Sequence, residues 1–395
     1  MEMAEFAALL TPEGLRLLDG LGTLDDTADV AAEVTRLRRD GHSPDLVAAV
    51  VGQARLRAKA RAKFGPFADR MLFTRAGLEQ ATRLESAARH AGRFRDAGLS
   101  RVADLGCGIG GDALGLAGIG LDVLAVDADE ITAAIAAYNL APFGSAATVR
   151  HARAEEVDLT GIDGVWLDPA RRSAGHSETR RLGADAWSPS LDWVTGLASR
   201  VPAGIKLGPG LDRDRIPDDV EAQWISVDGS TIELVLWSGV LARPGVTRAA
   251  LVVRGGSAAE LTASADALDA EVRPIGAFVH EPEGAVIRAR LIGDVARTLD
   301  AGMVSEGIAY LTSDAALTSP FVQSFRVREQ LPLKVPAINA VLAANGIGTL
   351  EIKKRGVDID PAQFRRKLRL RGDAAATLIL TRIGSARVAL LADRI

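Results

Sequence analysis

The sequence predicts an α/β protein in which a doubly wound, mostly parallel sheet lies between an N-terminal helical region and small C-terminal α+β domains. Three observations predict this fold class. An apolar strand runs into a glycine-rich turn and a helix at residues 101–117, apolar strands then alternate with helices to about residue 256, and the elements become more closely spaced beyond that point. The predicted divisions are a helical region over 1–95, an α/β domain over 96–256, a ferredoxin-like α+β domain over 257–330 and a last small domain over 331–395.

The composition is that of an ordinary globular protein. Of the 395 residues, 48% are hydrophobic and 25% are charged, and no run approaches the roughly 18 unbroken apolar residues that a membrane helix needs. The first residues carry acids where a secretion signal would carry bases, so we expect a cytoplasmic protein without a membrane segment. The single cysteine, Cys107, excludes an internal disulfide and a multi-cysteine zinc site, and we expect no bound metal. The oligomeric state stays open.

Two capping signals begin helices in the N-terminal region. Thr11-Pro12 and Ser43-Pro44 each place a hydroxyl residue before a proline at the first helical position. The helix after Ser43 carries five bases without an acid between them, on two faces: Arg55, Lys59 and Lys63 on one, Arg57 and Arg61 on the other. These bases either lie on a solvated face or contact an anionic partner.

The glycine-rich turn is the element around which the predicted sheet is organised. The strand over 102–105 is apolar apart from Asp104, and the turn after it contains Gly106, Gly108, Gly110 and Gly111, which permit positive φ and close approach of a ligand. A helix begins at Asp112, and a second strand ends at Asp127. These elements form the first half of a mononucleotide-binding unit, with Asp127 placed to hold ribose hydroxyls.

Two cofactors fit this unit. Glycines at 106, 108 and 111 satisfy the dinucleotide pattern, which would bring the pyrophosphate of a nicotinamide or flavin to the helix N-terminus. Asp104 works against an anion there and suits S-adenosyl-L-methionine, which carries an ammonium and a sulfonium and lacks phosphate. The D-L-G-C-G-x-G-G-D form resembles the first motif of class I S-adenosylmethionine-dependent methyltransferases. That resemblance implies that Gly106, Gly108 and Gly110 shape the cofactor turn and that Asp104 faces the methionine ammonium.

The alternation continues after Asp127. Strands are expected at 148–151, 165–167 and 204–207, and Asp228-Gly229-Ser230 between two apolar strands predicts a hairpin. Beyond residue 257 we expect short strands, a helix over about 285–299, and a helix over 361–370 that begins at Pro361.

The catalytic residues should follow the fourth and fifth strands, because ligands of an open α/β sheet lie at the C-terminal ends of its strands. The fourth strand ends in Asp168-Pro169-Ala170-Arg171-Arg172. Asp168 would accept from or orient the nucleophile, and Arg171 and Lys206 would position a phosphate or a base. A turn whose arginines pair with surface carboxylates is the structural alternative, as is a salt bridge for Lys206.

Two departures from known patterns limit these assignments. The D-P-A-R form resembles that of uridine C5 RNA methyltransferases, which use a later catalytic cysteine, but no cysteine follows Cys107, so that covalent mechanism is excluded. Families of this class often place an acid after the third strand to accept from the adenine amino group. Here Arg153 occupies that position, and Glu155 is the candidate acid.

Over nearly its whole length the chain resembles bacterial class I methyltransferases that carry a THUMP-like C-terminal domain. The resemblance rests on KFGPFADRMLFTRAGLEQAT, DLGCGIGGD, WLDPARR, KLGPGLD and EIKKRGVDIDPAQFRRKLRLRG. It implies a Rossmann-like methyltransferase domain and assigns the THUMP-like domain to 331–395. THUMP domains are associated with RNA-modifying enzymes, so the resemblance implies methylation of RNA, either tRNA or rRNA. A nicotinamide-dependent oxidoreductase and a non-catalytic RNA-binding module that retains the cofactor pocket are the alternatives.

A cluster of bases in the last domain is the candidate RNA surface. The chain has a net charge of −4, so any surface for nucleic acid must be local. The cluster ends one predicted strand and continues on the helix after it: Lys353, Lys354, Arg355, Arg365, Arg366 and Arg369. A merely solvated helix is the alternative.

Overall fold

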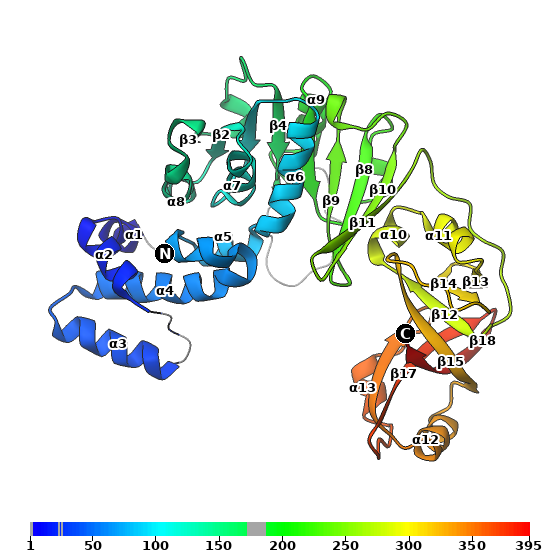
Figure 1. Cartoon of the computed structure of the whole chain (residues 1–395). Coiled ribbons are helices and arrows are strands. Elements are labelled where there is room, and N and C mark those ends of the chain that lie inside the picture. The colour runs from blue at the N-terminus through cyan, green and yellow to red at the C-terminus, as the bar shows by residue number, and fades with distance from the viewer. Residues whose placement is uncertain (1–2, 23, 25–26, 172–186) are drawn as a thin grey trace. The chain divides into compact units, whose positions relative to one another are not determined.

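The computed structural model describes residues 3–22, 24, 27–171 and 187–395 (Figure 1). It divides into two compact units, Met1–Leu207 with Leu236–Ala242, and Gly208–Val235 with Arg243–Ile395. Within the described ranges, no helix is both long enough and apolar enough to cross a membrane.

Helices form the start of the first unit, as the sequence predicts. They are α1 (Met3–Leu9), α2 (Pro12–Gly20), α3 (Thr27–Arg39), α4 (Pro44–Phe64), α5 (Arg75–Gln80) and α6 (Leu84–Asp96). Thr11 and Ser43 accept hydrogen bonds from the backbone N–H groups of Gly14 and Leu46, so both predicted N-caps form. A 3-10 turn, Gly65–Arg70, follows α4.

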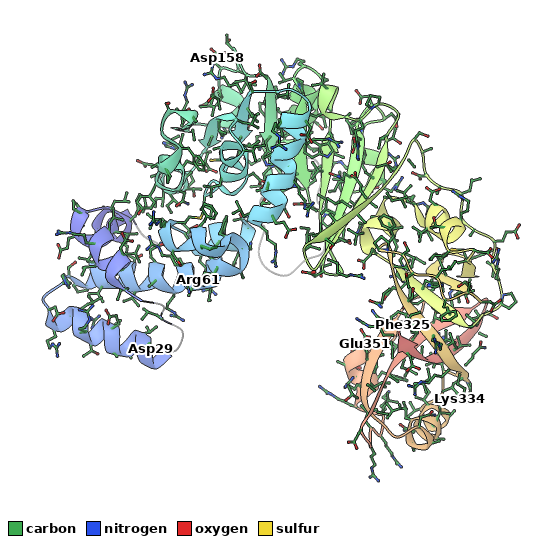
Figure 2. All side chains as sticks on the ribbon, viewed as in Figure 1. Asp29, Arg61, Asp158, Phe325, Lys334 and Glu351 are labelled. Carbon is green, nitrogen blue, oxygen red and sulfur yellow. The ribbon has the colours of Figure 1, made fainter. Side chains whose placement is uncertain are left out.

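Three of the five bases on α4 form hydrogen bonds or ion pairs within the helical region. Arg57 is buried and donates to the carbonyl of Met71 at 2.9 Å. Arg61, labelled in Figure 2, pairs with Asp69 at 2.9 Å. Lys63 donates to three carbonyls at the end of α5, those of Leu78, Glu79 and Ala81, at 2.7–2.8 Å. These three bases therefore stabilise the helical region, and Arg55 and Lys59 are exposed.

A parallel sheet forms the rest of the first unit. Its strands run in the order β7-β4-β1-β2-β3. They are β1 (Arg101–Leu105), β2 (Asp122–Asp127), β3 (Ala147–His151), β4 (Gly164–Leu167) and β7 (Ala203–Leu207), and the helices α7 (Gly111–Gly118), α8 (Glu130–Leu140) and α9 (Leu191–Ala198) lie between them in the chain. The strand order reverses between β1 and β4, which confirms a doubly wound sheet whose switch point lies at these strands.

The second unit begins with four strands in the order β11-β10-β8-β9. They are β8 (Glu221–Val227), β9 (Ser230–Trp237), β10 (Arg248–Arg254) and β11 (Ser257–Ala263). Asp228 and Gly229 both have positive φ, 48° and 82°, as a two-residue hairpin turn requires. The hairpin predicted at this point is therefore present.

A seven-stranded sheet forms the C-terminal part of the second unit, in the order β13-β14-β12-β15-β18-β17-β16. Its strands are β12 (Phe278–Pro282), β13 (Gly302–Ser305), β14 (Ile308–Ser313), β15 (Val322–Pro332), β16 (Ile347–Lys354), β17 (Ala374–Ile383) and β18 (Ala386–Arg394). The helices are α10 (Gly284–Arg288), α11 (Ile292–Thr298), α12 (Val335–Ala344) and α13 (Pro361–Arg365). The division predicted at residues 330 and 331 falls inside β15, and the domain limits stay a prediction.

Two helix predictions in this region are wrong in extent. The helix predicted over 285–299 is two helices, α10 and α11, because Arg290 between them has a φ of 60°, which a right-handed helix cannot continue. The helix begun by Pro361 ends at Arg365. The backbone N–H of Arg369 donates to Asn339 Oδ1 at 2.8 Å instead of to a helical carbonyl.

His280 on β12 is fully buried between two hydroxyl groups. Its Nδ1 lies 2.8 Å from Ser324 Oγ and its Nε2 lies 2.9 Å from Ser313 Oγ. Burial lowers the pKa of His280 from 6.5 to about 4. The imidazole is therefore neutral in the folded protein at neutral pH, with both ring nitrogens hydrogen-bonded.

This lowered pKa predicts an acid-sensitive C-terminal sheet. Between pH 6.5 and about 4 the unfolded chain binds more protons at His280 than the folded chain does. The free energy of unfolding should therefore fall as the pH falls through this window, by up to about 3 kcal/mol. Urea unfolding at about pH 8 and about pH 4.5 should show a smaller loss in His280→Gln than in the parent protein. Equal losses in the two proteins would contradict this prediction.

Candidate cofactor and methyl-transfer site

The glycine turn connects β1 to α7 and has the backbone geometry that the sequence predicts. Gly106, Gly108 and Gly110 all have positive φ, of 92°, 56° and 88°. The backbone N–H groups of Gly106 and Cys107 both donate to the carbonyl of Val126 at 2.9 Å, which fixes the turn against β2. A Cβ on Gly106 would lie 3.1 Å from the carbonyl oxygen of Asp168. A side chain at position 106 would therefore press against the backbone at the end of β4.

Asp127 at the end of β2 is anchored by two backbone N–H groups. Its Oδ2 accepts from Gly108 at 3.0 Å and its Oδ1 accepts from Asp129 at 2.9 Å. Burial raises the pKa of Asp127, and these two hydrogen bonds oppose that change. Each oxygen has a second lone pair, so the carboxylate can also accept from the hydroxyls of a ribose.

Asp104 is a buried carboxyl group that forms no hydrogen bond with the described part of the chain. Its side chain is 1% exposed, and neither of its oxygens has a hydrogen-bond partner among the described residues. Burial raises the pKa of Asp104 well above its usual value, and the nearby Asp112 and Asp168 raise it further, against the opposing charge of Lys206. An unpaired buried acid is costly for the fold. A cationic group of a ligand would offset that cost.

Asp168 and Lys206, predicted from the ends of β4 and β7, come together as an ion pair. Lys206 Nζ lies 2.5 Å from Asp168 Oδ2. The Lys206 side chain is 12% exposed, whereas that of Asp168 is 36% exposed and reaches solvent. Both predicted residues therefore lie in one site, with the acid on its accessible side.

Three residues that the sequence analysis did not select complete this site. Lys206 Nζ donates to Thr82 Oγ1 at 2.7 Å, and Thr82 Oγ1 lies 2.7 Å from Asp112 Oδ2. His90 Nδ1 lies 2.9 Å from Asp112 Oδ1, and its ring stacks on Trp166 at a centroid distance of 4.4 Å. Asp112 belongs to the glycine motif itself and could have been found there. Thr82 and His90 carry no recognisable signal in the sequence.

The structure also shows the surroundings of Cys107 and Glu155. Cys107 is buried in the glycine turn, and burial raises the pKa of its thiol well above the usual range. The thiol is therefore protonated at neutral pH and does not act as a nucleophile. Glu155 lies in the 3-10 turn Ala154–Glu156 after β3 and pairs at 3.2 Å with Arg153, the base that occupies the position where an acid is usual.

Arg171 ends the short strand β5 (Ala170–Arg171), which pairs with β6 (Trp187–Ser188). The structure describes only its backbone, and Arg172 lies outside the described residues. In the parts of the chain that are described, no cluster of His, Cys, Asp and Glu could hold a metal ion.

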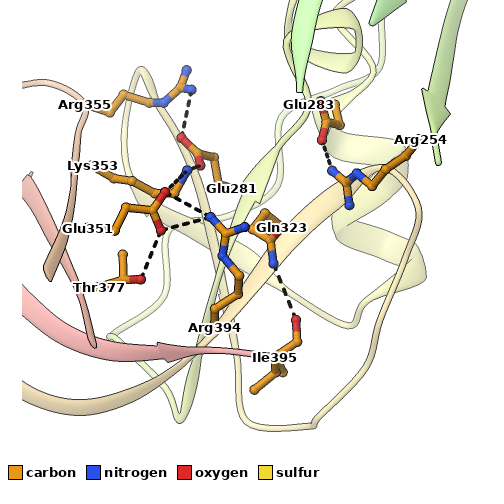
Figure 3. A network of polar contacts seen from close by, with 10 residues as sticks. All are labelled: Arg254, Glu281, Glu283, Gln323, Glu351, Lys353, Arg355, Thr377, Arg394 and Ile395. Carbon is orange, nitrogen blue, oxygen red and sulfur yellow. Dashed lines mark hydrogen bonds and ion pairs between the residues drawn. The ribbon is translucent and has the colours of Figure 1, made fainter. Parts of the chain in front are cut away.

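The six C-terminal bases divide into two groups. Lys353 lies 2.6 Å from Glu281, and Arg355 lies 3.7 Å from the same carboxylate, within the network drawn in Figure 3. Glu351 in turn binds Arg394 at 2.9 Å. Lys353 and Arg355 are thus paired with acids of the sheet. The four exposed bases are Lys354, Arg365, Arg366 and Arg369. Of these, Arg365 also donates to the carbonyl of Leu350.

The fold and the site are those of a cofactor-dependent α/β enzyme, with charged side chains gathered at the ends of the strands. Comparison with known proteins agrees with this class of enzyme. An uncharacterized S-adenosylmethionine-dependent methyltransferase, from two strains of Mycobacterium tuberculosis, is 34% identical over 339 residues, which cover 84% of this chain and 91% of that protein. Residues 322–394 match the THUMP domain-like family, and residues 2–60 match a domain of unknown function (DUF8688).

A solved structure has the same fold. The crystal structure of a methyltransferase candidate from Porphyromonas gingivalis W83 matches with a TM-score of 0.72 at 19% identity, covering 94% of this chain and 99% of that one. The identity to the mycobacterial relative shows that the chain belongs to the family of S-adenosylmethionine-dependent methyltransferases. It is an enzyme whose cofactor is S-adenosyl-L-methionine, as the glycine motif predicted.

Proposed function

We propose that this methyltransferase modifies RNA, either tRNA or rRNA, without a covalent cysteine intermediate. The observation that carries the proposal is the exposed basic group in the THUMP-like region: Lys354, Arg365, Arg366 and Arg369 in a chain with a net charge of −4. Basic side chains attract the phosphate backbone by releasing its counterions. An RNA substrate would also agree with the cytoplasmic location expected from the sequence.

The cofactor would lie in the glycine turn. Gly106, Gly108 and Gly110 permit its close approach, the unpartnered Asp104 would face the methionine ammonium, and Asp127 would hold the ribose. Glu155 remains the candidate for the adenine amino group, in competition with its pairing to Arg153. The sulfonium of the bound cofactor supplies the electrophilic methyl group.

Asp168 would orient the methyl acceptor. Its carboxylate is more exposed than that of any other acid in the site network, and it can accept a hydrogen bond from an O–H or N–H nucleophile. Lys206 would hold it in place, and Arg171 would contact a phosphate or a base. Cys107, buried with its thiol protonated, supports direct transfer from the cofactor to the RNA.

The two alternatives left open by the sequence lose support. A nicotinamide-dependent oxidoreductase does not agree with the family of the chain, and the mycobacterial relative is named as an enzyme, not as a binding module. The RNA proposal can be tested with radiolabelled S-adenosylmethionine and total tRNA or rRNA. Mass spectrometry of RNA nucleosides from cells with and without the gene should then reveal one lost methylated nucleoside. Labelling of protein with no labelling of RNA would overturn the proposal.

The proposed role of Asp104 predicts that its replacement raises thermal stability and weakens cofactor binding. Replacing Asp104 by Asn removes a buried acid that has no protein partner, so the cofactor-free variant should melt a few degrees higher, about 2–4 °C per kcal/mol gained. The same change removes the charged partner of the ammonium and should weaken binding of S-adenosylmethionine about tenfold in calorimetry. Unchanged affinity would show that the ammonium binds elsewhere.

A further inference from the structure

A closed polar clamp surrounds the ammonium of Lys206. An ammonium has three hydrogens and can only donate. Around Lys206 Nζ lie Thr82 Oγ1 at 2.7 Å, Asp168 Oδ2 at 2.5 Å and Asp112 Oδ2 at 3.6 Å. Lys206 and Asp112 are 12% and 8% exposed, so water has little access to these groups. The ammonium is therefore held by the protein itself.

The direction of each hydrogen bond in the clamp follows from these donors. Because Thr82 Oγ1 accepts from Lys206, its single hydrogen is available to Asp112 Oδ2, 2.7 Å away. The other oxygen of Asp112 lies 2.9 Å from Nδ1 of the buried His90. Burial alone would raise the pKa of Asp112, but Lys206, His90 and Thr82 together hold it well below its usual range. Asp112 is thus a charged anchor.

The backbone is built to bring this anchor into place. Asp112 lies in the first turn of α7, directly after the cofactor turn. A Cβ on Gly115 would lie 2.7 Å from the backbone of Ala87, so only glycine lets α7 pack this close to α6, which carries His90. The ring of His90 stacks on Trp166, which belongs to β4 and lies two residues before Asp168 in the chain. The clamp therefore connects the cofactor turn to β4, the strand that Asp168 directly follows.

We infer that Thr82 and Asp112 are positioning residues for methyl transfer: they hold the ammonium of Lys206, which in turn fixes Oδ2 of Asp168. The inference rests on the role proposed for Asp168. Neither Thr82 nor Asp112 would touch the RNA. Their effect on the transfer step would pass through Lys206.

The clamp can be tested without any substrate. The ¹⁵N signal of the Lys206 ammonium, assigned with Lys206→Met, should be visible and slow to exchange its hydrogens in the parent enzyme. Exchange should become at least about tenfold faster in Thr82→Val and in Asp112→Asn, since each change removes one acceptor or its charge. Thr82→Ser retains the hydroxyl and should restore slow exchange. Unchanged exchange in both Thr82→Val and Asp112→Asn would overturn the inference.

Kinetics then test whether the clamp serves transfer. Thr82→Val and Asp112→Asn should each lower kcat at least about tenfold, with KM for RNA and affinity for S-adenosylmethionine within about threefold of the parent. Added to Lys206→Met, neither change should lower kcat further, because all act on one group. Asp163→Asn is the matched control, since Asp163 caps the opposite end of β1 by accepting from Ser100 and Arg101. Faster exchange with full kcat would also overturn the inference. Absence of methyl transfer to RNA by the parent is a different result, which counts against the proposed function.

Discussion

Asp168→Ala should lower the rate of methyl transfer to RNA by about 10²-fold or more, while affinity for S-adenosylmethionine changes little. Asp168 is the acid at the end of β4 whose Oδ2 is held 2.5 Å from Lys206 and whose side chain is 36% exposed. Removing it takes away the acceptor that would orient the nucleophile. The glycine turn and Asp127, which would hold the cofactor, do not depend on that carboxylate.

The measurement is single-turnover transfer of a labelled methyl group, compared with calorimetric binding of the cofactor. Asp122→Ala is a suitable control because Asp122 is an exposed acid at the opposite end of the neighbouring strand β2. A rate in Asp168→Ala equal to that of the parent would reduce the turn after β4 to a structural element. A loss of cofactor affinity as large as the loss of rate would instead assign Asp168 to cofactor binding.

The parts of the site that could be predicted from sequence depend on short spacings. Gly106, Gly108 and Gly110 lie within five residues, and each needs the positive φ that glycine adopts most readily. Asp127 ends one strand and Asp168 directly follows another, and the ends of parallel strands meet at one edge of the sheet. Local pattern and fold rules were enough to bring these residues together.

The remaining parts depend on partners far apart in the chain. Thr82 is 30 residues from Asp112 and 124 from Lys206, so no spacing in the sequence reveals the clamp. The same holds for the C-terminal bases: Lys353 and Glu281 are 72 residues apart, and their pairing depends on how the seven strands are ordered. Composition predicted a basic segment but could not separate bases that pair with acids of the sheet from bases that face solvent.

The difference between paired and exposed bases decides which positions suit a charge reversal at the RNA surface. The suitable positions are Lys354, Arg366 and Arg369, which are exposed. Arg365 is left out because its guanidinium binds the carbonyl of Leu350, so that its replacement would also disturb β16. Lys353 and Arg355 are left out because reversing them would leave Glu281 beside like charges.

Reversing Lys354, Arg366 and Arg369 to Glu should weaken binding of tRNA or rRNA fragments on the order of 10²-fold at low salt. An exposed charge pair contributes about 0.5 kcal/mol, and reversal removes this attraction and adds a repulsion of similar size, so three positions give roughly 3 kcal/mol. Each lost phosphate contact should also reduce the salt dependence by about 0.7 on single-stranded RNA, so the slope should flatten by about 2. Filter binding or fluorescence anisotropy across a salt series measures both quantities.

The control carries the same change of charge elsewhere. Arg38 and Arg39 on α3 and Arg70 in the 3-10 turn after α4 are exposed, and their reversal to Glu changes the net charge by the same amount. If general electrostatic attraction accounts for RNA binding, both triple variants should lose affinity equally. If the THUMP-like surface holds the RNA, only the first should, and its binding of S-adenosylmethionine should match that of the parent. Binding as tight as the parent's at every salt concentration would exclude these three side chains from the RNA site.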